Sequence, residues 1–276
     1  MSCFIFWVLV LDPFCLLKTA LRIFVISLHL RTLSLLVKDD ILDIIRIIFT
    51  LRSSKMKRVM KLKTVDEMKD ILLAHGKSLS DFKAGTKVTV SNKMRKGYSY
   101  SLTCSPGTDM APEFKPYATP AEMLAAGVFE GKYLNDCLLE YPAEWFWDAI
   151  QAGKLCPGES NVSVNLFGVD SRKPISFWIE SGWLPNPSGS GHQTKKGQHP
   201  ELSDSTKNPD ERGWFQWYCR YWMGRRLPEL DSIQIKRWKA FTRHAGQIKA
   251  NCTPGDLECR PRQRQGLFQW SHDPFI

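Results

Sequence analysis

Hydrophobic positions recur with helical spacing in most of the segments that show any regular pattern. Thr64–Glu67 and Thr119–Glu122 each carry a threonine followed three residues later by a glutamate, the capping box that begins a helix. Apolar residues then repeat every three or four positions, until Gly76 ends the first pattern and Gly127 the second. The pattern therefore predicts helices over residues 65–75 and 120–126.

The middle of the chain predicts two more helices and one β-hairpin. A helix follows Pro142 and ends at Gly153, and a short one covers Pro174–Ser181. Residues 87–91 and 98–103 alternate in the manner of strands and flank a turn-like segment, so we expect them to pair. The residues of the short helix expected to face inward are Ile175, Trp178 and Ile179.

The last quarter of the chain reads as three helices. Trp214–Met223 is apolar nearly all round, which is typical of a buried helix. Asp231–Gln234 resembles another capping box, and an amphipathic helix follows it. One face of that helix holds Trp238, Phe241, Ala245 and Ile248, and the opposite face Lys236, Lys239, Arg243 and Gln247. We predict a mainly α fold (α+β possible), a helical globular domain with a small β-hairpin.

Composition divides the chain into four parts. Residues 1–55 form an N-terminal extension, and its apolar runs are each interrupted too early to span a bilayer. It is an artefact upstream of a start at Met56, a targeting segment, or an amphipathic segment in contact with a membrane. Residues 56–183 are expected to be a helical domain with the hairpin, and 184–212 a flexible loop rich in Pro, Gly and Ser. Residues 213–276 are a basic, aromatic-rich helical region packed on the preceding part.

The excess of positive charge is a property of the C-terminal quarter. The chain has a net charge of +10, and residues 212–270 hold twelve Lys and Arg against four Asp and Glu. A local positive field favours polyanions such as DNA, RNA or an anionic membrane surface. The alternative is a solvated basic face that binds nothing.

Nucleic-acid binding through phosphate contacts is therefore the leading function. Arginine and lysine bind phosphates, and an exposed aromatic ring stacks on bases. The amphipathic basic helix provides one group of cations, and the segments on either side of it provide a second. The candidate residues are Lys236, Lys239, Arg243, Arg225, Arg226, Arg260, Arg262 and Arg264, with Trp222 as the stacking ring. A protein-interaction module with a basic face is an alternative.

Residues 167–178 resemble the turn and second helix of a helix-turn-helix. A Gly-Val turn precedes a helix whose first residues are polar and basic. Ser171, Arg172 and Lys173 would then contact DNA from the helix N-terminus. The alternative is a plain helix.

A metal-dependent nuclease is the enzymatic alternative. Glu130 and Lys132 form an acid-x-lysine step, and Asp109 lies twenty-one residues upstream of Glu130. In such an enzyme the carboxylates hold Mg²⁺, while the lysine stabilises charge or orients water. The alternative is a surface ion pair. No small-molecule substrate is identifiable, because the chain lacks the glycine-rich motifs of nucleotide-binding folds.

Zinc is the other metal to consider. His244, Cys252, Cys259 and His272 could be ligands, although no two of them have the short spacing of a zinc knuckle. Buried thiols and a Cys252–Cys259 disulfide are alternatives. Eight cysteines without a C-x-x-C pair favour a reducing, intracellular compartment, cytoplasm or nucleus, or an organelle if the N-terminus is a transit peptide.

Three segments of the sequence resemble segments of other proteins. They are residues 122–136, which include Glu-Met-Leu and Gly-Val-Phe-Glu-Gly-Lys-Tyr-Leu-Asn-Asp, residues 213–226, and the Cys-Arg-Pro-Arg-Gln-Arg-Gln of residues 259–265. The chain resembles a set of uncharacterised proteins that share these blocks. The resemblance extends over about residues 115–272. It implies a folded domain and no activity.

Overall fold

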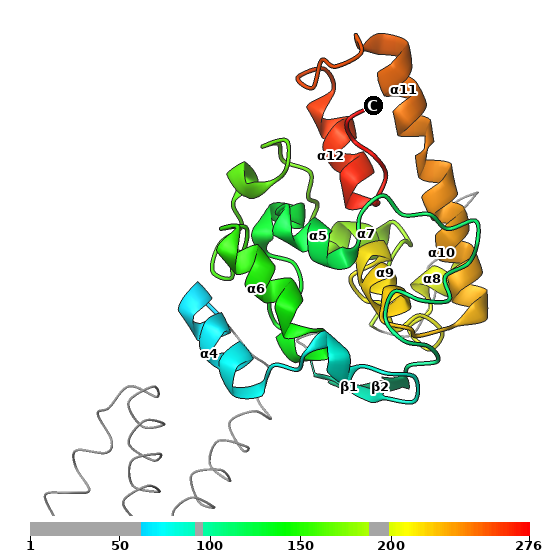
Figure 1. Cartoon of the computed structure of the whole chain (residues 1–276). Helices are drawn as coiled ribbons and strands as arrows, with labels where there is room; N and C mark the ends of the chain where they lie inside the picture. Colours follow the sequence, from blue (N-terminus) through cyan, green and yellow to red (C-terminus); the bar gives the residue numbers. More distant parts are fainter. Residues whose placement is uncertain (1–61, 92–95, 188–198) are drawn as a thin grey trace, which may run out of the picture. The chain divides into compact units, whose positions relative to one another are not determined.

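Over the residues that the structure describes, the fold is mainly helical and contains one two-stranded antiparallel sheet (Figure 1). The computed structural model describes residues 62–91, 96–187 and 199–276. Residues 1–55, for which the sequence allows three interpretations, therefore lie outside the described residues. The helices are α4 (Val65–His75), α5 (Pro120–Ala125), α6 (Ala143–Gln151), α7 (Ile175–Glu180), α8 (Pro200–Ser203), α9 (Trp214–Trp222), α10 (Pro228–Phe241), α11 (Arg243–Asn251) and α12 (Pro261–Gln269). Single helical turns occur at Leu79–Asp81, Val128–Gly131, Leu138–Glu140 and Val162–Val164.

Both predicted capping boxes are confirmed. At the start of α4 the Thr64 hydroxyl accepts the Glu67 N–H at 3.2 Å, and the Glu67 carboxylate accepts the Thr64 N–H. The same exchange begins α5, where Thr119 and Glu122 are the partners and Pro120 follows the cap. Proline is well placed there because the first helical N–H has no partner inside the helix.

The hairpin is also confirmed, with a shift of its second strand. Strand β1 (Lys87–Ser91) pairs antiparallel with β2 (Lys96–Ser101), so β2 begins and ends two residues earlier than expected. Val88, Val90 and Tyr100 are buried, which places one face of this small sheet against the core. The shift lies within the usual uncertainty of element ends.

An aromatic core surrounds helix α9, as its apolar composition predicted. Every residue from Trp214 to Tyr221 is buried. Phe114, from the loop before α5, lies at the centre of this core. Its ring is edge-on to Tyr218 at 5.5 Å and to Trp238 of α10 at 5.0 Å. A loop residue thus fills the space between α9 and α10.

The basic amphipathic helix is two helices rather than one, and it begins earlier than expected. Pro228 starts α10, and the Asp231 carboxylate accepts the Leu227 N–H at 2.7 Å from within the helix instead of before it. The helix ends at Phe241, and α11 begins two residues later. The Thr242 hydroxyl donates to the Lys239 carbonyl at 2.7 Å, a local bond that competes with regular helical bonding. Figure 1 shows α10 and α11 following one another, with α12 beside α11.

Two expectations for residues 174–212 differ from the structure. Helix α7 was expected to face the core with Ile175 and Trp178, yet these residues are 43% and 38% exposed. Its six residues follow a pattern too short to distinguish an inward face from an outward one. Of the segment 184–212 expected to be a flexible loop, residues 188–198 lie outside the described residues; the part from residue 199 onward contains α8, and Asp210 within it is fully buried. The polar composition of residues 199–212 reflects buried polar contacts rather than exposure.

Candidate nucleic-acid interface

Arg225, predicted to bind phosphates, is locked together with Arg220 in a buried ion-pair cluster. Arg220 of α9 binds Glu140 through its Nε at 2.6 Å and Asp210 through Nη1 at 2.8 Å. Arg225 binds the other oxygen of Asp210 at 2.6 Å. Burial alone would raise the pKa of Asp210, but the guanidinium groups of Arg225 and Arg220 outweigh it and hold that pKa below its usual value. Arg225 is therefore internal and is removed from the candidate surface.

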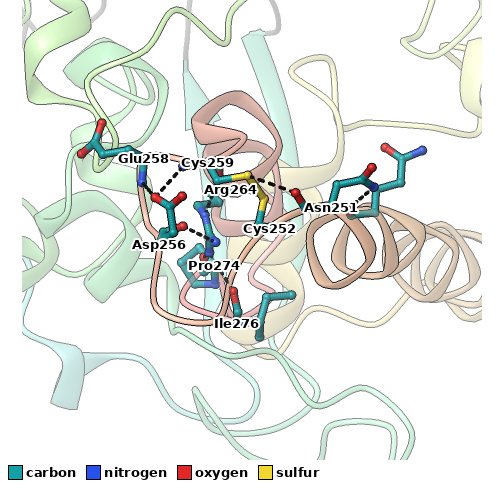
Figure 2. The surroundings of a disulfide bond; sticks show 9 residues. Asn251, Cys252, Asp256, Glu258, Cys259, Arg264, Pro274 and Ile276 are labelled. Atoms are coloured by element: carbon teal, nitrogen blue, oxygen red, sulfur yellow. Dashed lines mark hydrogen bonds between the residues drawn. A yellow bond between two sulfur atoms is a disulfide. The ribbon is translucent and has the colours of Figure 1, made fainter.

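Arg264 is also internal. Its side chain is fully buried in α12, and its guanidinium donates only to backbone carbonyls among the described residues (Figure 2). The acceptors are Cys259 at 2.9 Å, Pro274 at 2.7 Å, Ile276 at 2.9 Å and Asp256 at 2.8 Å. Arg264 therefore holds the loop before α12 and the C-terminal segment together. It does not reach a ligand in solvent.

Arg226 and Trp222 are half-buried and already engaged. The Arg226 guanidinium lies over the Tyr221 ring at 4.1 Å and donates to the carbonyls of Tyr221 and Asp109, each at 2.6 Å. The Trp222 ring meets Trp145 edge-on at 5.3 Å. The Arg226 contacts fix the loop before α5 against the end of α9, and the Trp222 contact joins that end to α6. Neither side chain is free to turn toward a phosphate or a base.

Three predicted cations remain together in solvent. Lys236, Lys239 and Arg243 are exposed and follow one side of α10 and the start of α11; we refer to them as the cationic stripe. The opposite side of α10 holds the buried Trp238, and Ile248 is buried in α11. The predicted division of this segment into a core face and a solvent face is therefore confirmed. Within the described residues, the stripe has one ion pair, Lys239 with Glu113 at 4.0 Å.

The remaining candidates lie at the start of α12. Arg262 is exposed in its first turn, whereas Arg260 caps the helix and is half-buried. Because α11 and α12 pack side by side, both arginines belong to the same helical hairpin as Arg243. Lys249, in the last turn of α11, is a further exposed cation that the periodicity did not single out.

Sequence reasoning also missed Arg237, which lies beside the stripe. Its guanidinium is 4.8 Å from the Trp183 ring centre and 5.2 Å from that of Trp270. It donates to the Gln234 side chain at 2.8 Å. Burial lowers the pKa of Arg237 to about 10, so the group stays charged at neutral pH. The signal in the sequence was its position on the flank of the helix, between the cationic and the apolar faces.

The three candidate nuclease residues are engaged in separate contacts. The Glu130 carboxylate is buried and pairs with Arg172 at 3.3 Å, while the Lys132 ammonium donates to the Gly158 carbonyl at 2.5 Å. Asp109 is exposed in the loop that Arg226 holds. Among the described residues no group of three or more His, Cys, Asp and Glu side chains could hold a metal ion. Glu130 does line a hollow of about 400 Å³ that is open to solvent and carries charges of both signs.

The helix-turn-helix interpretation does not match the structure. All the residues between α6 and α7 are described, and their only helical element is the turn Val162–Val164. A recognition helix needs a first helix to pack against, and here there is none. Ser171 instead accepts a hydrogen bond from Gln269 of α12 at 2.6 Å, and Arg172 pairs with Glu130.

The four candidate zinc ligands are engaged in other contacts. Cys252 and Cys259 are joined in a disulfide, the alternative that the sequence had left open (Figure 2). His272 stacks on Trp238 with ring centres 4.7 Å apart, and His244 contacts Phe241 at 4.4 Å. Burial lowers the pKa of both histidines. In this state neither sulfur is a thiolate, the form that binds zinc.

No protein-family model, curated protein or solved structure matches the chain. Within the described ranges, none of the helices combines the length and the apolar character needed to cross a bilayer.

Proposed function

We propose that the protein binds nucleic acid through the cationic stripe, with Lys249 and Arg262 extending the contact onto the rest of the α11–α12 hairpin. The main support is that Lys236, Lys239 and Arg243 lie on the exposed side of α10 and α11, whose other side is buried in the core. Lys236 and Arg243 are seven positions apart, which corresponds to about 10 Å along a helix axis. Duplex DNA carries one charge per about 1.7 Å of its axis, so several phosphates lie within reach of this stripe.

The chemistry of this surface favours contacts with the phosphate backbone. Three of its five members are lysines, whose compact and hydrated charges suit phosphates, whereas Arg225, Arg264 and the ring of Trp222 are engaged elsewhere. Base-specific recognition needs groups that reach base edges or stack on base faces. The proposed binding is therefore dominated by phosphates, depends little on sequence and weakens steeply with salt.

A gel-shift series with duplex DNA and with single-stranded RNA, each titrated with salt, tests the proposal. The logarithm of the affinity should fall by about 0.9 per tenfold rise in salt for each duplex phosphate neutralised. The triple variant Lys236→Glu, Lys239→Glu, Arg243→Glu should reduce this slope by nearly three contacts, about 2.7 on duplex DNA. The stripe is exposed, so thermal unfolding should show that this variant stays folded.

A control with the same change in net charge separates a local contact from a general field. Lys77, Lys83 and Lys87 are exposed cations on β1 and the segment before it, and their reversal to Glu changes the total charge equally. We expect this control to retain most of the affinity. Equal losses in the two triple variants, or unchanged binding in the stripe variant, would remove the stripe from the proposal.

A substitution of Glu113 should strengthen nucleic-acid binding, the opposite effect to that of the stripe variant. Its carboxylate lies 4.0 Å from the Lys239 ammonium, and both side chains are about half exposed. Removing it with Glu113→Gln frees Lys239 and removes a charge that repels phosphates. Exposed pairs are worth up to about 1 kcal/mol, so binding should tighten by about two- to fivefold at low salt. Weaker binding of Glu113→Gln would contradict the assignment of Lys239.

A protein-interaction role is the second candidate, and helix α7 favours it. Ile175, Phe177 and Trp178 are 43%, 45% and 38% exposed on one six-residue helix. Clustered exposed apolar side chains are typical of surfaces that contact another protein. Pull-down of partners that survives nuclease treatment and is lost in Phe177→Ser with Trp178→Ser would support this role. Loss of all partners on nuclease treatment would leave nucleic acid as the partner.

A further inference from the structure

The Cys252–Cys259 disulfide closes the connection between two helices that carry the proposed cationic surface. Cys252 directly follows α11, and Cys259 lies two residues before α12 (Figure 2). The residues between the two cysteines, 253–258, are all exposed, and the cysteines themselves are half-buried. A small thiol in solution therefore reaches this bond without unfolding the domain.

A second set of contacts holds the same connection without the disulfide. The Arg264 guanidinium donates to the carbonyls of Asp256 and Cys259 at 2.8 and 2.9 Å. The Asp256 carboxylate accepts the N–H groups of Glu258 and Cys259, both at 3.1 Å. The path of residues 256–259 is thus fixed by hydrogen bonds as well as by sulfur. Breaking the disulfide should release the Cys252 end of the loop while the Arg264 contacts keep the domain together.

The other cysteines of the described residues differ in their surroundings. Cys137 and Cys219 are 3% and 0% exposed in the core. Cys104 and Cys156 are half-buried and unpaired. Only one described pair is therefore both bonded and accessible, and it lies at a junction between two helices.

We propose that Cys252–Cys259 is a reversible redox clamp on the α11–α12 hairpin. Closed, it fixes the end of α11 to the start of α12. Opened by low-molecular-weight thiols of the glutathione class, it lets the end of α11 and residues 252–255 move locally while the rest of the domain remains folded.

The exchange balances without any further reactant. The thiolate of one small thiol attacks one protein sulfur, which breaks the S–S bond and leaves a mixed disulfide and one protein thiolate. A second small thiolate attacks the small-thiol sulfur of that mixed disulfide, releasing the second protein thiolate and an oxidised small-molecule disulfide. The two protein thiolates take up two protons. Two electrons pass from the small thiols to the protein, and the reverse sequence closes the clamp.

The clamp also bears on nucleic-acid binding, and this consequence rests on the proposed function. Lys249 lies in the last turn of α11, and Arg260 and Arg262 lie at the start of α12, so these cations flank the disulfide. Opening the clamp removes the fixed spacing between them. We expect the reduced protein to bind duplex DNA more weakly, by about two- to tenfold, because a phosphate-binding surface loses pre-organisation.

The clamp itself is tested without any ligand. The 276-residue chain is equilibrated in buffers with graded ratios of reduced to oxidised glutathione, quenched with acid, unfolded in denaturant, alkylated and analysed by mass spectrometry. Cys252 and Cys259 should change together in one reversible two-electron transition, while Cys104, Cys137, Cys156 and Cys219 stay alkylatable under all conditions. Absence of the bond in the most oxidising buffer would overturn the proposal. So would reduction that occurs only after denaturation.

Hydrogen exchange distinguishes a clamp from an inert crosslink. In the reduced protein, amides of residues 250–255 should exchange faster by about tenfold or more, while those of α9 stay unchanged. The double variant Cys252→Ser, Cys259→Ser should reproduce this pattern in oxidising buffer, and Cys156→Ser should not. Identical exchange in the two redox states, or faster exchange throughout the domain, would overturn the proposal. An open clamp with unaltered DNA binding would leave the redox transition intact and count only against the proposed cationic surface.

Discussion

Arg220 and Glu140 form a two-point ion pair in the interior of the protein. The Nε–Oε1 distance is 2.6 Å and the Nη2–Oε2 distance 3.2 Å, and both side chains are almost fully shielded from water. The Tyr100 hydroxyl donates to Oε1 of Glu140 at 3.2 Å. Since Tyr100 belongs to β2 and Arg220 to α9, this pair joins the hairpin to the aromatic core.

Removing one partner of this pair should be strongly destabilising, because the other charge would remain buried without compensation. We expect Glu140→Gln to lower the free energy of unfolding by about 3–5 kcal/mol. Urea unfolding followed by tryptophan fluorescence measures the change. Lys83→Met, which removes an exposed charge, should change stability by less than about 0.5 kcal/mol. A loss below 1 kcal/mol in Glu140→Gln would show that water reaches the pair.

The sequence predicted most of the local structure because the signals were local. A capping box involves residues three positions apart, such as Thr64 and Glu67, and its hydrogen bonds form whatever the rest of the chain does. The solvent face of α10 was likewise readable from the spacing of Lys236 and Lys239. These features depend on helical geometry alone.

Whether an arginine is buried or exposed depends on partners that are distant in the sequence, so local patterns could not predict it. Glu140 lies eighty residues from Arg220 in the chain. Arg225 and Lys236 both look like surface cations in the sequence, yet only Arg225 meets a buried carboxylate, that of Asp210. Asp210 itself lies in a polar stretch whose composition predicted a flexible loop. Charge composition therefore overestimated how much of the C-terminal positive charge faces solvent.

The stability supplied by Asp210 should be lost in acid. Its pKa is lower in the folded protein than the usual value of about 3.9, so the folded state binds fewer protons than the unfolded state in this range. The contribution is present above that usual value and disappears as the pH falls through the folded pKa. Urea unfolding of the wild type and Asp210→Asn at several pH values should show a large difference at pH 7 that shrinks below about pH 4. A difference that stays constant from pH 7 to pH 3 would contradict the ion-pair assignment.

The position of Arg237 between Trp183 and Trp270 should require a planar cation. Arg237→Lys keeps the charge but loses stacking on two rings and the bond to Gln234. We expect a loss of about 1–2 kcal/mol in unfolding free energy, measured by urea titration. Lys236→Arg on the neighbouring exposed position serves as the reverse exchange and should be neutral within about 0.5 kcal/mol. Equal stabilities of Arg237→Lys and the wild type would mean that the rings contribute nothing beyond burial.

Gly127 should be intolerant of a side chain for two separable reasons. Its φ is +83°, and a Cβ atom at this position would lie 1.9 Å from the Val164 carbonyl oxygen. Gly153 has a similar φ of +66° but open space around the same position. The left-handed conformation alone costs a residue with a Cβ about 1–2 kcal/mol, so Gly153→Ala should lose about that much. Gly127→Ala must also displace the Val164 backbone and should lose about 3 kcal/mol or more. The difference between the two variants in thermal unfolding measures the cost of the steric overlap with Val164, because both variants pay nearly the same cost for a positive φ. Matching losses would mean that the turn Val162–Val164 moves away from Gly127 at little energetic cost.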